Sequence, residues 1–280
     1  MHAARRTADI RPPSGPREAP SRARLAWAVV TSRQPDLLAP LLDLPGVADA
    51  AEDARSALGN AHRHRTNLRN WPVTSAESAV RGARSSSALD GGGVQLEASS
   101  GEEDPVLAGA LRVGQALEGG TTSLVGVWQR APLQALARLH ALGAADLVDE
   151  AGLGRPRQVP EVAARLDLVT RLVTGGSSVP APVLAAVAHG ELLTLAPFGS
   201  ADGVVARAVS RLVTIASGLD PHGLGVPEVY WLRRADEYRA AAAAFASGDP
   251  EGVGIWLLLC CRALEDGARE ALSIAEAAGK

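Results

Sequence analysis

The stretch from His189 to Arg207 reads HGELLTLAPFGSADGVVAR and decides how the rest of the chain is interpreted. Apolar residues with helical spacing lead up to Leu195, a short loop rich in Gly, Ser and Asp follows, and an amphipathic pattern begins at Val204. This succession predicts a buried helix, a tight loop and a second helix. The loop is therefore expected directly before a helix N-terminus.

The loop residues allow two interpretations from their chemistry alone. Free backbone amides and the helix dipole favour an anion at a helix N-terminus, and Gly199 and Gly203 permit the close approach that a phosphate requires. Asp202 is also a good N-cap residue, so the loop could be a tight turn that only starts the helix. An anion site and a capped turn both remain open at this point.

The composition indicates an ordinary globular protein. The chain has 280 residues, of which 46% are hydrophobic, enough for a sizeable core. Its formal net charge of −3 gives no basis for nucleic-acid binding, which requires a basic surface. The local basic cluster Arg63-His64-Arg65 is interpreted as a solvated helix face rather than a ligand site.

The cysteines and the longest apolar run bear on the location of the protein. Cys260 and Cys261 are adjacent and are the only cysteines, so they provide neither a disulfide framework nor a zinc site. We interpret them as small buried hydrophobic side chains of a cytoplasmic protein. The run 253–261 has about half the length that a bilayer span needs, so we expect no membrane segment.

Helical patterns with turn signals between them follow one another along the chain, and the fold class predicted is all-α. Ser75 is the expected N-cap of a helix that begins near residue 74. Only the segment from Gly152 to Pro160, GLGRPRQVP, is expected to form a short β-hairpin. The expected helices cover residues 48–61, 74–83, 106–117, 133–142, 162–173, 182–195, 204–217, 227–246 and 251–277.

The loop and the start of the second helix resemble the signature of the Fic (Fido) family. That signature runs His-Pro-Phe-x-Asp/Glu-Gly-Asn-Gly-Arg-x-x-Arg, and the corresponding register here is APFGSADGVVAR, from Ala196 to Arg207. Pro197, Phe198, Gly203 and Arg207 match it. The resemblance implies a Fic-like helical bundle with a short β-hairpin flap and additional C-terminal helices, in which Pro197 and Phe198 pack the loop onto the core.

In the family that this loop resembles, a nucleotide, usually ATP, binds between two core helices and an adenylyl group is transferred to a protein hydroxyl. The histidine of the signature is the general base, and the acidic residue holds Mg²⁺. The Gly-Asn-Gly amides form an anion hole, and two arginines hold the phosphates.

Several of these groups are absent from the present chain. Ala196 stands at the histidine position and cannot accept a proton, Ser200 replaces the metal-binding acid, and Val204 replaces the first arginine. Loss of the general base alone typically costs about 10²–10⁴ in rate. The resemblance therefore implies no catalytic residue, no metal site and no cofactor. The remaining candidates for nucleotide or anion binding are Ser200, Asp202, Gly203 and Arg207.

A second motif lies upstream, where Ser86, Asp90 and Gly91 resemble the family's inhibitory helix, Ser/Thr-x-x-x-Glu-Gly/Asn. In family members that carry this helix, the glutamate pairs with the second arginine of the signature and blocks productive ATP binding. The partner here would be Arg207. We therefore expect Asp90 and Arg207 to lie close enough for a charge-assisted hydrogen bond.

The resemblance also suggests how the chain is organised. Residues 121–142 and 152–157 resemble the family's core helix and the start of its flap. We expect a disordered Arg/Pro-rich tail at 1–24, a helical extension at 25–74, a Fic-like core at 75–218 and C-terminal helices packed on the core at 219–280.

Two functions are compatible with these residues. The first is a Fic-like protein without adenylyl transfer, acting as a protein-binding or regulatory module whose unknown partner docks near the flap between Gly152 and Pro160. The alternative is a divergent nucleotide-dependent transferase that uses ATP and Mg²⁺, with Ser200 or His189 transferring the proton. His189, two helical turns before Ala196, is more readily interpreted as a core histidine, and an accidental resemblance of an unrelated helical fold is a third possibility.

Overall fold

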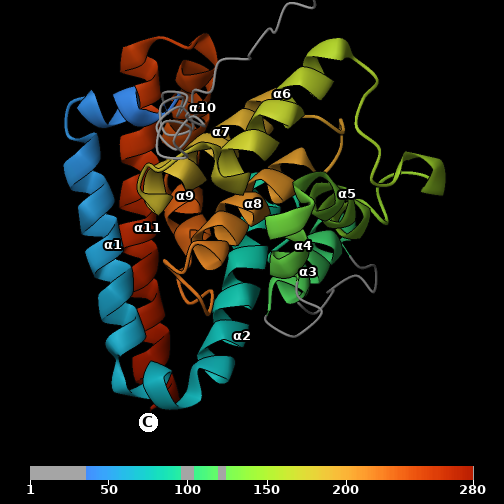
Figure 1. Ribbon diagram of the computed structural model, residues 1–280. Coiled ribbons are helices and arrows are strands. Elements are labelled where there is room, and N and C mark those ends of the chain that lie inside the picture. The colour runs from blue at the N-terminus through green and yellow to red at the C-terminus, as the bar shows by residue number, and fades with distance from the viewer. Residues whose placement is uncertain (1–35, 96–103, 119–123, 280) are drawn as a thin grey trace, which may run out of the picture. The chain divides into compact units, whose positions relative to one another are not determined.

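A computed structural model describes residues 36–95, 104–118 and 124–279 of the protein (Figure 1). These residues form helices, turns and loops but no strand, so the predicted all-α class is confirmed for this part of the chain. The expected tail at 1–24 lies outside the described residues. The α-helices are α1 (Val47–Arg63), α2 (Arg65–Leu89), α3 (Pro105–Leu117), α4 (Leu124–Arg130), α5 (Pro132–Gly143), α6 (Pro160–Arg171), α7 (Ala181–Leu195), α8 (Asp202–Ala216), α9 (Pro227–Arg233), α10 (Ala235–Ser247) and α11 (Pro250–Ala278). Shorter helical turns are η1 (Ala39–Asp43), η2 (Glu150–Gly152) and η3 (Leu172–Gly176).

Helix α7 is shared by two hydrophobic clusters, as expected for a helix that is apolar on all sides. Val183 and Ala186 belong to the cluster formed with α1, α10 and α11. Ala185, Ala188 and Leu192 belong to the cluster formed with α3, α5 and α8. Because α7 is fixed from both sides, its C-terminal end gives the following loop a rigid base.

Small side chains allow the C-terminal helix α11 to pack closely against its neighbours. It lies beside α1 (Figure 1), where Ala51, Ala54 and Leu58 of α1 are buried. A Cβ added to Gly267 of α11 would lie 2.7 Å from the backbone nitrogen of Pro227, so only glycine permits this approach to α9. The Gly267 carbonyl also accepts a hydrogen bond from the Val226 amide (3.1 Å).

Two predicted helix boundaries are wrong. The helix expected over 74–83, with Ser75 as its N-cap, begins at Arg65, and the Ser75 hydroxyl instead donates to the His222 carbonyl (2.7 Å). Helix α2 contains a kink at Asn70 (φ −141°, ψ 35°). Because the helix is interrupted there, the sequence pattern did not predict the turns that precede the kink. The single helix expected over 227–246 is divided into α9 and α10 at Arg234, whose backbone leaves the helical region (φ −126°, ψ 42°).

The predicted β-hairpin flap is also wrong, because the segment from Gly152 to Pro160 contains no strand. Pro156 and Pro160 lack the amide hydrogen that a strand ladder needs. The Arg157 amide donates to the Pro197 carbonyl (2.8 Å) and not to a second strand of a hairpin. The segment is therefore an extended loop fixed against the loop between α7 and α8.

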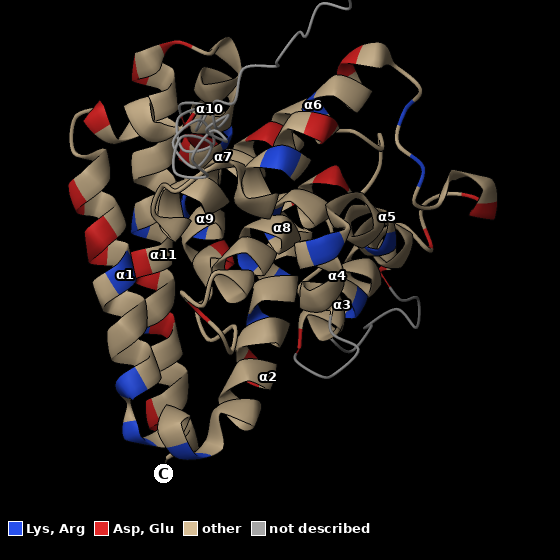
Figure 2. Ribbon diagram, viewed as in Figure 1, with Lys and Arg blue, Asp and Glu red and all other residues tan. Residues whose placement is uncertain are grey.

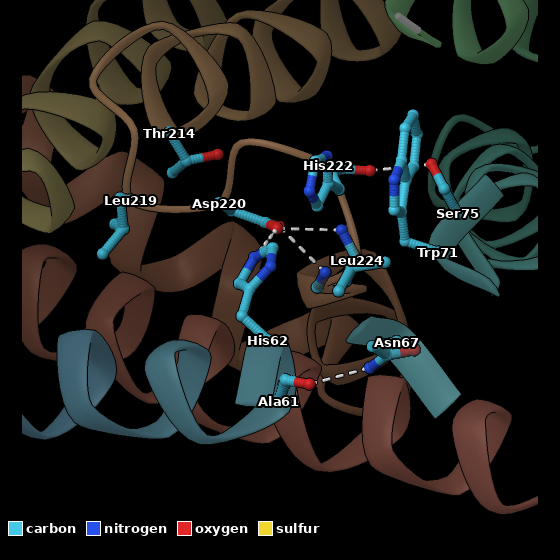
Figure 3. A network of polar contacts seen from close by, with 12 residues as sticks. Ala61, His62, Asn67, Trp71, Ser75, Thr214, Leu219, Asp220, His222 and Leu224 are labelled. Atoms are coloured by element: carbon cyan, nitrogen blue, oxygen red, sulfur yellow. Dashed lines mark hydrogen bonds and ion pairs between the residues drawn. The ribbon is translucent and has the colours of Figure 1, made fainter. Parts of the chain in front are cut away.

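Asp220 organises the loop that follows α8 (Figure 3). Its carboxylate accepts hydrogen bonds from the backbone amides of Leu224 and Gly225, both at 2.9 Å, and lies 2.7 Å from Nε2 of His62. Burial disfavours the charged carboxylate, but the His62 ring and the two amides outweigh burial and lower the pKa of Asp220. Asp220 thereby joins the end of α1 to the loop after α8.

The same loop is attached to α2. The His222 ring stacks on Trp71 with a centroid distance of 4.2 Å (Figure 3). The Ser78 hydroxyl donates to the Leu224 carbonyl (2.9 Å). Helix α2 is thus held along one side before it reaches the region of Asp90.

Cys260 and Cys261 are free and buried, as expected, and burial raises the pKa of Cys261 to about 12. Among the described helices, none combines the length and the apolar character needed to cross a membrane.

Candidate anion site at the N-terminus of helix α8

The loop between α7 and α8 reverses the chain by means of left-handed backbone conformations. Ala196 (φ 45°), Gly199 (φ 81°) and Ala201 (φ 49°) all have positive φ. For a residue other than glycine this conformation costs about 1–2 kcal/mol. The two alanines therefore keep it only because the surrounding contacts fix the loop.

Asp202 provides some of these contacts. Its carboxylate accepts hydrogen bonds from the amides of Phe198 (2.9 Å) and Gly199 (2.7 Å). Ala201 occupies the N-cap position and Asp202 is the first residue of α8, so the expected N-cap role of Asp202 is wrong. Burial raises the pKa of Asp202, although the two amides and Arg157 act in the opposite direction.

Arg157 holds the loop from the other side. Its guanidinium donates to the carbonyls of Leu195 (2.7 Å) and Ala196 (3.0 Å). These carbonyls belong to the end of α7, where a cation is favourable and helix hydrogen bonds are lacking. Arg157 therefore acts as a side-chain cap of α7 and secures the extended loop that precedes α6.

His140 of α5 belongs to the site but was not among the residues predicted from the sequence. Its Nδ1 accepts a hydrogen bond from the Gly154 amide (2.9 Å), and its Nε2 lies 3.0 Å from the Ser200 hydroxyl. Its ring stacks on Phe198 at 4.2 Å. The only sequence signal was its helical spacing with apolar residues, which predicted an inward-facing side chain.

The hydrogen bonds of His140 assign its tautomer. Because Nδ1 accepts a hydrogen bond from the Gly154 amide, the neutral ring carries its proton on Nε2, and this N–H group donates a hydrogen bond to the Ser200 hydroxyl. Burial lowers the pKa of His140, which favours this neutral form. His140 thus positions Ser200 and cannot accept the proton of the Ser200 hydroxyl.

Asp90, at the end of α2, reaches the N-terminus of α8. One carboxylate oxygen accepts a hydrogen bond from the Val204 amide (3.1 Å), and the other lies 2.8 Å from Nη2 of Arg207. The expected hydrogen bond between Asp90 and Arg207 is therefore present. The carboxylate of Asp90 thus supplies an anion from the chain itself at the N-terminus of α8 and at Arg207, which was a candidate for anion binding.

Gly203 permits this approach. A Cβ added to Gly203 would lie 2.4 Å from an oxygen of Asp90, well inside van der Waals contact. Any larger residue at this position would have to displace the carboxylate.

Arg207 is only 1% exposed and has several partners. It donates from Nε to the Ser86 hydroxyl (2.8 Å) and from Nη2 to the Ser86 carbonyl (3.0 Å). Nη1 donates to the Tyr238 hydroxyl at 3.5 Å. Ser86 and Asp90 of the upstream motif and Arg207 of the loop motif are thus brought together.

His189 lies in the core, as expected. It is 0% exposed, and its ring packs against Trp231 and Trp256 at centroid distances of 4.7 and 5.0 Å. Its Nε2 lies 2.8 Å from the Tyr238 hydroxyl, which accepts from Arg207 and so donates to His189. Burial, and then the charge of Arg207, lower the pKa of His189.

The residues around the loop do not fit a Mg²⁺ site of the kind described for the family that the loop resembles. Both oxygens of Asp202 are engaged by backbone amides, Asp90 is paired with Arg207, and Ser200 accepts from His140. A neutral hydroxyl is a poor replacement for a carboxylate ligand of Mg²⁺. In the described ranges no cluster of three or more His, Cys, Asp or Glu side chains is arranged to hold a metal ion.

A groove lies beside the loop and has a volume of about 590 Å³. Its walls are lined by apolar side chains, namely Leu133 of α5, Val162 and Leu166 of α6, Phe198, and Val159 of the extended loop. This volume lies in the range of about 300–1,000 Å³ that is typical of small-molecule pockets.

No protein-family model and no curated protein matches the sequence. Among solved structures, the chain is similar to a Fic family protein from Desulfovibrio desulfuricans G20, with a TM-score of 0.54 and 16% sequence identity. The similarity covers 82% of this chain and 74% of that chain. The chain therefore has a Fic-like fold.

Proposed function

We propose that this Fic-like protein has lost adenylyl transfer and acts as a protein-binding or regulatory module. The observation that carries the proposal is the position of Asp90. Its carboxylate accepts hydrogen bonds from the Val204 amide and from Arg207. A nucleotide phosphate bound at this helix N-terminus would need the same donors. A bound phosphate would have to displace Asp90 and would lie near a second carboxylate, that of Asp202.

The loop also lacks a proton acceptor for a target hydroxyl. Ala196 has no titratable side chain, and the Nε2 of His140 is committed to donating to Ser200. Val204 provides no second positive charge. Removing one donor that stabilises developing charge costs about 10²–10³ in rate, in addition to the loss of the base.

The hydrogen bonds of Arg207 support the same conclusion. Even without Asp90, the guanidinium retains the hydroxyl and the carbonyl of Ser86 and the hydroxyl of Tyr238 as acceptors. Its burial and these contacts indicate a structural role that links α2, α8 and α10. The Fic-like scaffold is then preserved for its surface rather than for its chemistry.

We propose that the partner is a protein segment that places apolar side chains in the groove beside Val159 and Phe198. Strand addition to a hairpin is not the expected mode, since the segment from Gly152 to Pro160 is an extended loop. Arg157 and Asp167 at the groove offer one charge of each sign for orientation of the segment. A reducing, cytoplasmic location suits the two free buried thiols.

A transfer assay with adenine-labelled ATP tests the loss of chemistry. We expect no label on protein substrates with the wild-type chain, and none with Ala196→His, because Ser200 and Val204 still lack the required groups. A matched series of variants combines Ala196→His with Ser200→Asp and Val204→Arg, which supply the other missing groups of the signature, and with Asp90→Ala, which removes the carboxylate from the site. Label transferred by the wild-type chain would overturn the proposal and support the alternative, a divergent nucleotide-dependent transferase.

A further inference from the structure

The connection between α1 and α2 forms a surface that is both basic and apolar. We call it the basic elbow and define it by Arg63, Arg65, Leu68, Arg69 and Val73. Leu68 is 68% exposed and Val73 is 53% exposed, and both lie close in sequence to the exposed arginines. The kink at Asn70 lies between them and Pro72 follows it in the helix.

The three arginines of the basic elbow are exposed, and none forms an ion pair with another described side chain. Figure 2 shows basic residues gathered where α1 meets α2, whereas acidic residues dominate the other end of α1.

Helix α11 brings few opposing charges to this end of the molecule. A Cβ on Gly279 would lie 2.9 Å from the Thr66 hydroxyl, so the last turn of α11 adjoins the elbow. Glu276 is the exposed acid of that turn. The three arginines therefore leave the elbow with a local excess of positive charge.

The elbow is fixed by contacts beneath its exposed residues. The Asn67 side chain donates to the Ala61 carbonyl (2.8 Å), and the His64 ring accepts from the Thr66 amide (3.3 Å). Trp71 is held by its stacking on His222. A surface that is already ordered loses little conformational entropy when a partner binds.

We infer that the basic elbow is a docking surface for an acidic segment of another protein that also carries apolar side chains. Arginine is enriched at protein interfaces because its guanidinium binds carboxylates through two parallel hydrogen bonds. Leu68 and Val73 provide the apolar contact that such an interface needs at its centre. This surface is separate from the groove near Phe198 and does not depend on the chemistry of the α8 loop.

Two other classes of anionic partner fit the elbow less well. Recognition of an anionic membrane typically uses about four to eight Lys or Arg residues, and the elbow has three exposed arginines. A nucleic acid would use its phosphates and gain nothing from Leu68 and Val73, and the net charge of −3 opposes binding of a polyanion.

The test measures fluorescence anisotropy of a labelled amphipathic peptide built from Glu and Leu, titrated with the full chain. We expect saturable binding that weakens with salt, and about tenfold or greater loss of affinity in the triple variant Arg63→Glu/Arg65→Glu/Arg69→Glu. A peptide with Lys in place of Glu should not bind. The variant Leu68→Ser/Val73→Ser should also weaken binding, which separates an interface from charge attraction alone.

The matched control is Arg138→Glu/Arg171→Glu/Arg262→Glu, which changes the net charge equally at three other exposed arginines. It should leave the affinity within about twofold. Equal loss in the control and elbow variants would overturn the inference. So would the absence of peptide binding, preferential binding to phosphatidylserine vesicles or to an oligonucleotide, or self-association of the chain that the elbow substitutions abolish.

Discussion

The carboxylate of Asp90 and the guanidinium of Arg207 meet at 2.8 Å, joining the end of α2 to the first turns of α8. The arginine side chain is 2% exposed and the aspartate side chain is 25% exposed, so one partner is buried and the other borders solvent. A buried cation needs its acceptors, because an unpaired charge in the interior is strongly unfavourable. The pair therefore contributes to the stability of the fold as well as filling the candidate anion site.

Replacement of Asp90 should destabilise the protein moderately. In Asp90→Ala, Arg207 keeps its Ser86 and Tyr238 partners while the Val204 amide loses its acceptor, so we expect a loss of about 1–3 kcal/mol in the free energy of unfolding. Urea denaturation measures this loss. As a control, Asp146→Ala removes the acid of the solvent-exposed ion pair with Arg112. This substitution should lower the free energy of unfolding by no more than about 1 kcal/mol. Equal effects of the two substitutions would show that the Asp90 pair is no more than a surface contact.

The close approach of Asp90 to Gly203 predicts a coupling between the two positions. Gly203→Ala alone should destabilise the protein by about 1–3 kcal/mol, because the new Cβ would overlap the carboxylate. In the Asp90→Ala background the same substitution should be neutral or stabilising, since the overlap is gone and alanine favours the helix. A double-mutant cycle measures this non-additivity, and strictly additive effects would contradict the contact.

The left-handed conformation of Ala201 predicts a stabilising substitution. Ala201→Gly relieves about 1–2 kcal/mol of backbone strain and adds about 0.5–1 kcal/mol of unfolded-state entropy, for a net gain of about 0.5–1 kcal/mol. Thermal and urea unfolding measure the gain. The control is Ala164→Gly at an exposed position of α6, which should instead destabilise by about 1 kcal/mol. Destabilisation by both substitutions would argue against a positive φ at position 201.

The lowered pKa of Asp220 predicts how stability depends on pH. A carboxylate whose pKa is lower in the folded than in the unfolded state contributes stability above the unfolded value, and this contribution is lost as pH falls through the folded pKa. We expect Asp220→Asn to lose about 2–4 kcal/mol at neutral pH. The difference from the wild-type chain should shrink as pH falls below about 4.

Urea unfolding over a pH series checks the role of Asp220. Asp53→Asn, at an exposed position of α1, serves as the control and should track the wild-type chain within about 0.5 kcal/mol at every pH. A constant difference between Asp220→Asn and the wild-type chain down to the lowest pH would contradict the linkage.

The sequence was sufficient for the parts of the fold that depend on local pattern. The apolar run before Leu195, the glycines of the following loop and the amphipathic run after it predicted α7, the loop and α8 closely. The spacing of Ser86, Asp90 and Gly91 predicted the hydrogen bond between Asp90 and Arg207, although these two residues are 117 positions apart in the sequence. That prediction needed the resemblance to a known motif, because no local rule connects such distant positions.

Other features depend on tertiary contacts and could not be predicted. The first turns of α2 continue through a kink at Asn70 next to Pro72, and the stacking of Trp71 on His222 contributes to holding them. The bonds from Arg157 to the end of α7 replace the hairpin that was expected. The role of His140 follows from two partners, Gly154 and Ser200, that come from different parts of the chain.

Calorimetric titration with ATP and Mg²⁺ measures whether the N-terminus of α8 binds a nucleotide phosphate, on which the proposed loss of adenylyl transfer depends. We expect no saturable heat for the wild-type chain, in which Asp90 accepts from the Val204 amide and Arg207. We also expect none for Asp90→Ala, in which Ser86 and Tyr238 still accept from Arg207. Saturable binding in the micromolar range by the wild-type chain would contradict the claim. Binding by Asp90→Ala alone would show a locked nucleotide site in place of a lost one.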